Sequence, residues 1–223
     1  MAVSFFEQGF EIINGLLSAD ELASLDVALG NIELEGKTGG IRHADKKIKA
    51  ISELALSKKL VGLAQCYLLE KPALVRVILF DKTPENNWLV TWHQDRTLAV
   101  SAKFDAESWG PWSMKEGVHH VQPPQDVLDQ MITCRIHLDD SHEKNGCLNI
   151  MPQSHKLGLI PLSKIKNYVS KKESVACVAD AGSVLVMRPH LLHSSSKAIM
   201  PSRRRVIHIE YSCYELPVGI SWA

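Results

Sequence analysis

Short apolar runs separated by turn-forming residues follow one another along the chain from about residue 74 onward. The run Leu74–Phe80 is short and rich in β-branched residues, so it predicts a buried strand. The same criteria predict further strands over residues 88–95, 131–138, 147–151, 183–187 and 205–213. Residues 164–173 form an irregular, lysine-rich segment. Many short strands joined by Gly, Pro and Asx turns favour a mainly β protein, a barrel or jelly roll with helical additions.

Helices are predicted before the strands begin. A capping box over residues 18–21 starts the first helix, and its apolar face is formed by three leucines: Leu22, Leu25 and Leu29. Gly30 is placed to end this helix. A second helix is expected to begin near Ser57 and must end before Pro72. Residues 31–50, between the two helices, have no clear period.

The longest irregular stretch covers residues 102–130. A loop of this length in a compact domain is usually functional or disordered, and its tryptophans and histidines argue against disorder. Trp109 and Trp112 are expected either to anchor the loop in the core or to form walls of a substrate pocket. A non-catalytic role is favoured for His119 and His120.

Composition narrows the functional class. A chain of 223 residues is expected to form a single domain over residues 1–223. Its formal charge is zero and its basic residues are mostly dispersed, which argues against nucleic acid and favours a small-molecule partner. Five widely spaced cysteines without a Cys-x-x-Cys motif indicate free thiols. Because neither a signal peptide nor a membrane-spanning run is visible, a cytoplasmic protein is expected; the oligomeric state stays open.

One motif at the end of a predicted strand points to chemistry. His93 and Asp95 lie two residues apart, so on a strand they would share a face while Gln94 points away. An imidazole nitrogen and a carboxylate oxygen could then bind one cation. His193, inside another apolar stretch, is the preferred third ligand. Two histidines and one carboxylate suit Fe(II) and leave three coordination positions open.

The same kind of motif occurs elsewhere, so alone it is a weak signal. His-x-Asp recurs in the runs His43-Ala44-Asp45 and His137-Leu138-Asp139, and His208-Ile209-Glu210 is a variant of it. The first is expected to be a solvated loop beside two lysines. The second runs from a strand into a turn, and the third could line the barrel behind the metal.

Four segments, taken together and in this order, resemble the phytanoyl-CoA dioxygenase family of Fe(II)- and 2-oxoglutarate-dependent oxygenases. They are TWHQDR, LDDSHEKNGCLNIMPQSH, AGSVLVMRPHLLHSSS and RRRVIHIEY. The resemblance covers most of the chain from about residue 74. It implies a double-stranded β-helix, a cupin-like jelly roll, with Fe(II) at its mouth, 2-oxoglutarate as cosubstrate and dioxygen as oxidant.

The resemblance also assigns residues. The iron ligands would be His93, Asp95 and His193. Arg204, eleven residues beyond His193, would hold the distal carboxylate of 2-oxoglutarate with help from Ser195.

Two weaker assignments complete the cosubstrate site implied by the resemblance. Arg135 falls on a strand position that often contacts 2-oxoglutarate in relatives, although commonly as another residue type. Arg42 would fill a basic position near the cosubstrate or the substrate. Strand alternation sends Arg204 and His208 to one face of the last strand, and Arg205 to the other.

The activity implied is hydroxylation of an unactivated C–H bond of a small molecule, with release of succinate and carbon dioxide. Related halogenases replace the ligand carboxylate by a small residue, so Asp95 favours hydroxylation. One alternative is a non-catalytic jelly-roll protein that binds a metal or a small carboxylate. Another is a metal-dependent isomerase on a cupin-like barrel, which would use additional histidines such as His119, His120 or His137. No CoA-binding determinant is recognisable, so the primary substrate is not specified.

Overall fold

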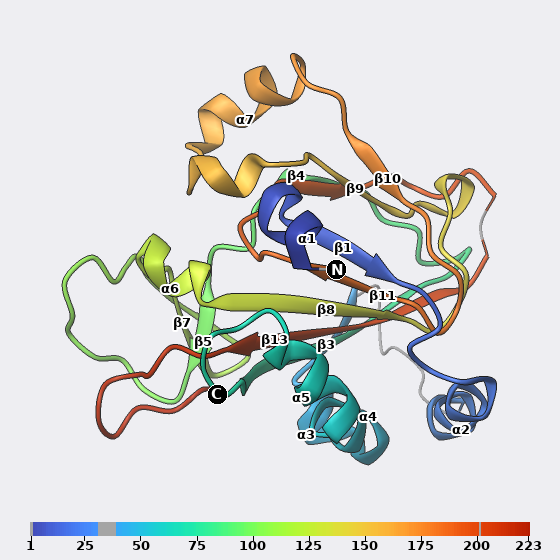
Figure 1. The fold of residues 1–223 in the computed structure, drawn as a ribbon, viewed down its shortest axis with the longest axis horizontal. Coiled ribbons are helices and arrows are strands. Elements are labelled where there is room, and N and C mark those ends of the chain that lie inside the picture. Colours follow the sequence, from blue (N-terminus) through green and yellow to red (C-terminus); the bar gives the residue numbers. More distant parts are fainter. Residues whose placement is uncertain (1, 31–38, 201) are drawn as a thin grey trace.

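Two antiparallel sheets form the body of the protein, whose computed structural model describes residues 2–30, 39–200 and 202–223. The larger sheet contains, in spatial order, β1 (Phe10–Ile13), β11 (Val184–Met187), β8 (Met131–His137), β13 (Arg204–Ser212), β3 (Ala73–Lys82) and β2 (Gly40–Arg42). The smaller sheet contains β10 (Val175–Cys177), β9 (Leu148–Ile150), β12 (His193–Ser195) and β4 (Val90–His93). Figure 1 shows the smaller sheet stacked over the larger one. This is the expected double-stranded β-helix, or jelly roll.

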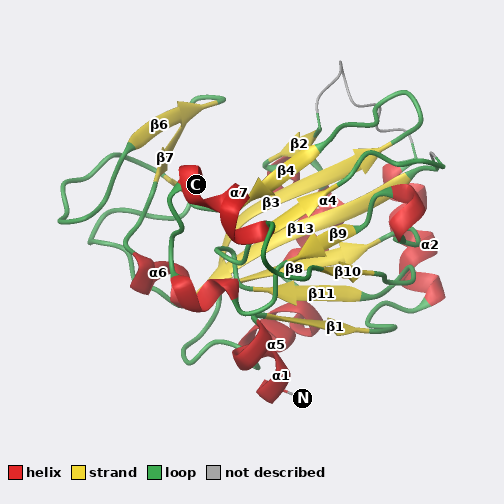
Figure 2. Ribbon diagram, turned by 90° about the horizontal axis from the view of Figure 1, so that it is seen from above, coloured by secondary structure: helices red, strands yellow, loops and turns green. Residues whose placement is uncertain are grey.

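A third, three-stranded sheet contains β5 (Leu98–Val100), β7 (Val118–Val121) and β6 (Trp112–Lys115), in that order. Figure 2 shows the β6–β7 hairpin beyond one end of the two larger sheets. Two of these strands and the helix α6 (Gln125–Asp129) lie inside residues 102–130. The sequence prediction of a long irregular loop was therefore wrong for this segment.

Helices cover the outer face of the larger sheet. The N-terminal ones are α1 (Ala2–Gln8), α2 (Ala19–Leu29), α3 (Ala44–Lys47), α4 (Lys49–Ala55) and α5 (Lys58–Gln65). The other elements are α7 (Leu162–Val169) and two 3₁₀ turns, Glu143–Asn145 and Ser154–Leu157. In Figure 1 the helices α3, α4 and α5 lie beneath the sheet that carries β3 and β13. None of the helices within the described ranges has the length and apolar character needed to cross a membrane.

Strand alternation divides the larger sheet into an apolar outer face and a polar inner face. On β3, Val77 and Leu79 belong to the core shared with the helices, whereas Arg76, Ile78 and Phe80 line an internal cavity. The outer side of β13 joins the same core through Ile207 and Ile209, which pack with Ile51 and Leu60 of the helices, among others. Burying these apolar side chains fixes the register, because a one-residue slip would reverse both faces. The inner face is thereby left for charged side chains.

The local predictions for the N-terminal part are confirmed at both helix starts. Ser18 and Glu21 form the reciprocal capping box of α2, and Ser57 caps α5 by accepting from the Leu60 amide. The helices α3 and α4 were missed, because residues 31–50 showed no period; residues 31–38 lie outside the described part of the chain. The prediction of irregular structure for residues 164–173 was also wrong, since α7 occupies much of it.

Candidate active site

His93 and His193 face each other across the smaller sheet, as direct partners in the pairing of β4 with β12. Their ring centroids are 4.2 Å apart. Nδ1 of His93 lies 2.9 Å from the Thr91 carbonyl oxygen, and Nδ1 of His193 lies 2.8 Å from the Leu191 carbonyl oxygen. These contacts fix Nδ1 as the protonated nitrogen and leave each Nε2 lone pair free.

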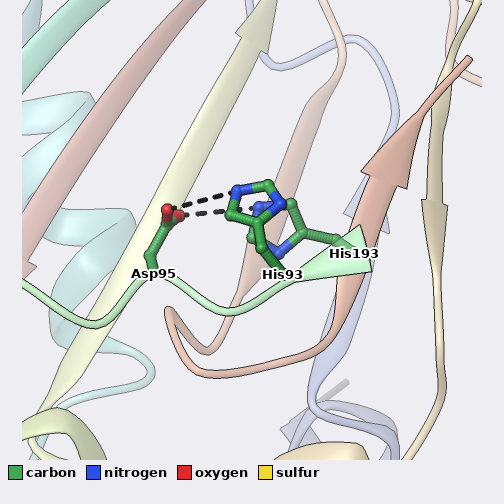
Figure 3. A group of neighbouring side chains, drawn as sticks. All are labelled: His93, Asp95 and His193. Atoms are coloured by element: carbon green, nitrogen blue, oxygen red, sulfur yellow. Dashed lines mark ion pairs between the residues drawn. The ribbon is translucent and has the colours of Figure 1, made fainter. Parts of the chain in front are cut away.

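Asp95 completes the group from the loop that follows β4. Its carboxylate oxygens lie 3.7 Å from Nε2 of His93 and 3.7 Å from Nε2 of His193 (Figure 3). The three donor atoms all lie within 4.8 Å of one another. Its backbone amide donates to the Pro189 carbonyl at 2.9 Å, which holds the loop in place.

Gln94 turns to the opposite side, as the alternation predicted. Its amide nitrogen donates to the carbonyls of Gly158 and His190, both at 2.7 Å, and its oxygen accepts from the Ile160 amide at 2.9 Å. Because both the nitrogen and the oxygen of the Gln94 side-chain amide are hydrogen-bonded, they hold the backbone between His93 and Asp95 in place. The direction of His93 and Asp95 is therefore set by a buried hydrogen-bond network on the far side.

The group fits a divalent metal by the chemistry of its donors. Oδ2 of Asp95 is buried without a hydrogen-bond partner among the described residues. Burial lowers the pKa of His193 to about 4, so its imidazole is neutral near pH 7 and can donate a lone pair. Two imidazoles and one carboxylate on one side of an ion are the facial set that non-haem Fe(II) oxygenases use.

A cavity of about 180 Å³ opens beside these side chains. At one end stands Arg204, which is 5% exposed and makes no hydrogen bond or ion pair with any described residue. Ser195 lines the same cavity, but its hydroxyl donates to the Gly146 carbonyl at 2.8 Å. Gly146 has φ +75°, and a Cβ there would collide with the carbonyl oxygen of Ser196, so only glycine fits this turn.

Lys82 is a second cation at this end, and sequence reasoning missed it. It is the direct cross-strand partner of Arg204 and is 1% exposed. Its ammonium donates to Ser195 Oγ at 3.2 Å and to the Ser196 carbonyl at 2.8 Å, and lies 5.2 Å from the centre of the Trp88 ring. Burial and the positive charge of Arg204 lower the pKa of Lys82 to about 8.

The three consecutive arginines have three different environments, in agreement with the predicted alternation. Arg203 pairs with Asp81 at 2.8 Å, and Arg205 pairs with Asp139 at 2.7 Å on the outer face. Arg204 alone of the three lines the cavity.

Behind the metal ligands, four charged or polar side chains form a chain of contacts across β8, β13 and β3. Arg135 lies 2.8 Å from Nδ1 of His208, whose Nε2 lies 3.1 Å from the Glu210 carboxylate. Arg76 pairs with the same carboxylate at 2.5 Å. Asp95, His208 and Glu210 also lie close enough to form a possible ligand group, but Arg76 and His208 already occupy one oxygen of Glu210.

Several predicted residues lie away from the cavity lining. Arg42 on β2 pairs with Glu116 at 2.8 Å and is half exposed. Trp109 and Trp112 pack on the Phe104 ring, with centroids 4.8 and 5.3 Å apart, which agrees with loop anchoring. Within the described ranges, neither His43 nor His137 belongs to a group that could hold a metal ion.

Comparisons with known proteins agree with this geometry. Residues 5–206 match the family model described as phytanoyl-CoA dioxygenase (PhyH). No curated protein matches the chain significantly.

Solved structures share the fold at low sequence identity. EctD from S. alaskensis, solved with 2-oxoglutarate and 5-hydroxyectoine, is 20% identical at a TM-score of 0.72, and the match covers 95% of this chain and 74% of the EctD chain. HygX from Streptomyces hygroscopicus, solved with nickel and 2-oxoglutarate, is 16% identical at a TM-score of 0.67, and the match covers 93% of this chain and 83% of the HygX chain. The alpha-ketoglutarate-dependent epimerase SnoN from nogalamycin biosynthesis is 17% identical at a TM-score of 0.69, and the match covers 99% of this chain and 83% of the SnoN chain.

The family model covers nearly the whole chain and includes all three potential iron ligands, and the fold of the neighbours is the one described above. This chain therefore belongs to the phytanoyl-CoA dioxygenase family of Fe(II)- and 2-oxoglutarate-dependent oxygenases.

Proposed function

We propose that this enzyme hydroxylates an unactivated C–H bond of a small molecule and releases succinate and carbon dioxide. The observation that carries the proposal is one cavity with a two-histidine, one-carboxylate set beside it and, at its end, a buried arginine that has no partner among the described residues. A protein that only stored a metal would have no use for that arginine. The alternative of a non-catalytic binding protein is therefore disfavoured.

His93, Asp95 and His193 would hold Fe(II). With 2-oxoglutarate and dioxygen, iron in such a set supplies oxidative decarboxylation and an oxidant strong enough for C–H bonds. The chain's part is to keep both imidazoles in the tautomer that leaves Nε2 free, through the carbonyls of Thr91 and Leu191. Asp95 keeps its carboxylate in the set, which favours hydroxylation over halogenation.

Arg204 and Lys82 would hold the distal carboxylate of 2-oxoglutarate. Two cations that are direct cross-strand partners in a buried site repel each other, and the lowered pKa of Lys82 reflects this. An anion between them relieves the repulsion and satisfies the unpaired guanidinium. Ser195, which accepts from Lys82, would orient the ammonium toward the same anion.

Arg135 is proposed as a residue that shapes the middle of the cosubstrate site. It lines the cavity, lies over the Phe80 ring at 5.4 Å, and is fixed by His208. Arg42, tied to Glu116, would act only at the edge of the site.

We further place the enzyme in the cytoplasm with a small-molecule substrate and no nucleic-acid partner. All five cysteines are free thiols, which suits a reducing compartment.

Oxygen labelling tests the reaction type. Purified enzyme with Fe(II), ascorbate and 2-oxoglutarate would be incubated under ¹⁸O₂ with fractionated small-molecule extract, and new products detected by mass spectrometry. Hydroxylation predicts a product that gains one ¹⁸O atom, with succinate formed in equal amount. A product of unchanged mass, as an epimerase like SnoN would give, would contradict hydroxylation while leaving cosubstrate use intact. The Asp95→Ala variant is the matched control for metal-dependent turnover.

A further inference from the structure

The β6–β7 hairpin has one aromatic face and one polar face. Ser113 pairs with His120 and Lys115 with Val118, so these four side chains share a face. The other face carries Trp112, whose ring packs on Phe104. On the polar face Ser113 and Lys115 are exposed, whereas His120 is buried.

An ion pair at the hairpin turn fixes where the polar face lies. Glu116 contacts Arg42 at 2.8 Å and Lys47 at 4.0 Å, which ties the turn to β2 and α3. Arg42 is also the cross-strand partner of Ile78, which lines the cavity, so the hairpin turn lies beside the rim of the cavity. Lys115, next to Glu116 in the chain, is exposed there, and the charges of Arg76, Arg42 and Asp95 act on its ammonium group.

Basic groups in this place lack partners. His120 is 1% exposed, and neither of its ring nitrogens has a hydrogen-bond partner among the described residues. His43 is 8% exposed, its Nε2 also lacks a partner within the described ranges, and its charge acts on His120. Glu116 is shared between Arg42 and Lys47, so Lys115 is left without an acidic partner in the described ranges. Buried polar groups without partners are rare and call for a ligand or water.

This basic cluster is distinct from the cosubstrate end of the cavity. Along β3, Lys82 pairs with Arg204 while Arg76 pairs with Glu210, six residues away. At the rise of an extended strand this separation is about 20 Å. The metal ligands lie toward the Arg76 end, because Asp95 is close enough to Arg76 to raise its pKa. A five-carbon diacid bound between Arg204 and the metal cannot also reach Lys115.

We propose that the primary substrate carries a carboxylate, and that Lys115 and His120 bind it so that the rest of the molecule extends past Arg76 toward the metal. This inference rests on the proposed oxygenase function, because the primary substrate is the molecule that the oxygenase would hydroxylate. A carboxylate fits because the donors are few: one ammonium and one N–H of a neutral imidazole. Burial, first, and the surrounding cations lower the pKa of His120 to about 4, so the ring has a single N–H to donate.

The test is a binding experiment that needs no turnover. Protein with ¹⁵N-labelled histidines would be loaded with Zn(II), which is diamagnetic and redox-inert, and saturated with N-oxalylglycine to fill the cosubstrate site. The imidazole ¹⁵N resonance of His120 would be assigned as the signal missing from the His120→Gln variant. Its shift would then be followed while hexanoate, hexanamide or hexyl phosphate is added. The variants are Lys115→Met and, as a matched control on the same segment, Lys103→Met.

Hexanoate should shift the His120 resonance at concentrations where hexanamide does not. Lys115→Met should weaken hexanoate binding roughly tenfold, which corresponds to about 1.4 kcal/mol, whereas Lys103→Met should not. Equal binding of hexanamide, or unchanged binding in Lys115→Met, would overturn the inference. Tighter binding of hexyl phosphate would overturn the assignment to a carboxylate. This binding test involves no oxygen, so its failure can be distinguished from a failure of 2-oxoglutarate decarboxylation. Because Lys115 is exposed, its replacement should not disturb folding.

Discussion

Replacing Arg204 by alanine should weaken 2-oxoglutarate binding strongly. The guanidinium is buried and has no partner in the described part of the chain, so it can bind a carboxylate through two parallel charge-assisted bonds of about 1.5–3 kcal/mol each. Lys82 remains beside Ser195 and keeps part of the attraction. A net loss of roughly 1.5–3 kcal/mol is therefore expected. At about 1.4 kcal/mol per tenfold, the Michaelis constant for 2-oxoglutarate should rise roughly ten- to a hundredfold.

The assay is 2-oxoglutarate-dependent succinate formation, together with an anaerobic titration that reports binding alone. Arg204→Lys should recover part of the affinity, because an ammonium provides a point charge instead of a planar fork. Arg203→Ala is the matched control; its half-exposed ion pair with Asp81 should contribute little to stability and nothing to cosubstrate binding. Normal 2-oxoglutarate dependence in Arg204→Ala, with damage in Arg203→Ala or Arg205→Ala, would show that the site is wrongly placed on β13.

Three further predictions follow from the same site. Alanine at any one of the three metal ligands should abolish Fe(II)-supported decarboxylation, whereas His137→Ala should keep most of it; equal loss in the fourth variant would reopen the ligand assignment. Burial and Arg204 lower the pKa of Lys82 from 10.5 to about 8, so between these values the unfolded chain keeps a proton that the folded protein releases. Thermal unfolding should therefore show wild type gaining stability relative to Lys82→Met as pH rises from about 8 to 10.5, and a flat or falling difference would refute this. Amides of residues 102–130 should gain protection from hydrogen exchange when cosubstrate and substrate bind, and strong protection already present in the free protein would make the segment a fixed wall.

The sequence predicted those features that depend on local periodicity. Short apolar runs between turn residues identified β3, β4, β8, β9, β11 and β13, and strand alternation correctly separated Arg204 from Arg205 and Gln94 from its neighbours. The capping box of Ser18 was readable because both of its bonds lie within four residues.

What the sequence did not reveal depends on contacts between distant segments. Lys82 stands at the end of an apolar strand before a polar turn, which is typical of a surface lysine; only pairing with Arg204 and cover from Trp88 bury it. The helices α3 and α4 lack side-chain caps, since His43 and Ile48 precede them, so no start signal was visible. The β6–β7 hairpin is held by the Arg42–Glu116 ion pair, whose partners are 74 positions apart in the chain.

The central claim is that His93, Asp95 and His193 hold Fe(II) in a site that also binds 2-oxoglutarate. The most direct measurement is the anaerobic absorption spectrum of the protein with Fe(II), before and after 2-oxoglutarate is added. The account predicts a new visible charge-transfer band on addition of the cosubstrate, present in wild type and His137→Ala and lost in His193→Ala. A spectrum that does not change when 2-oxoglutarate is added to the Fe(II)-loaded wild-type protein would contradict it.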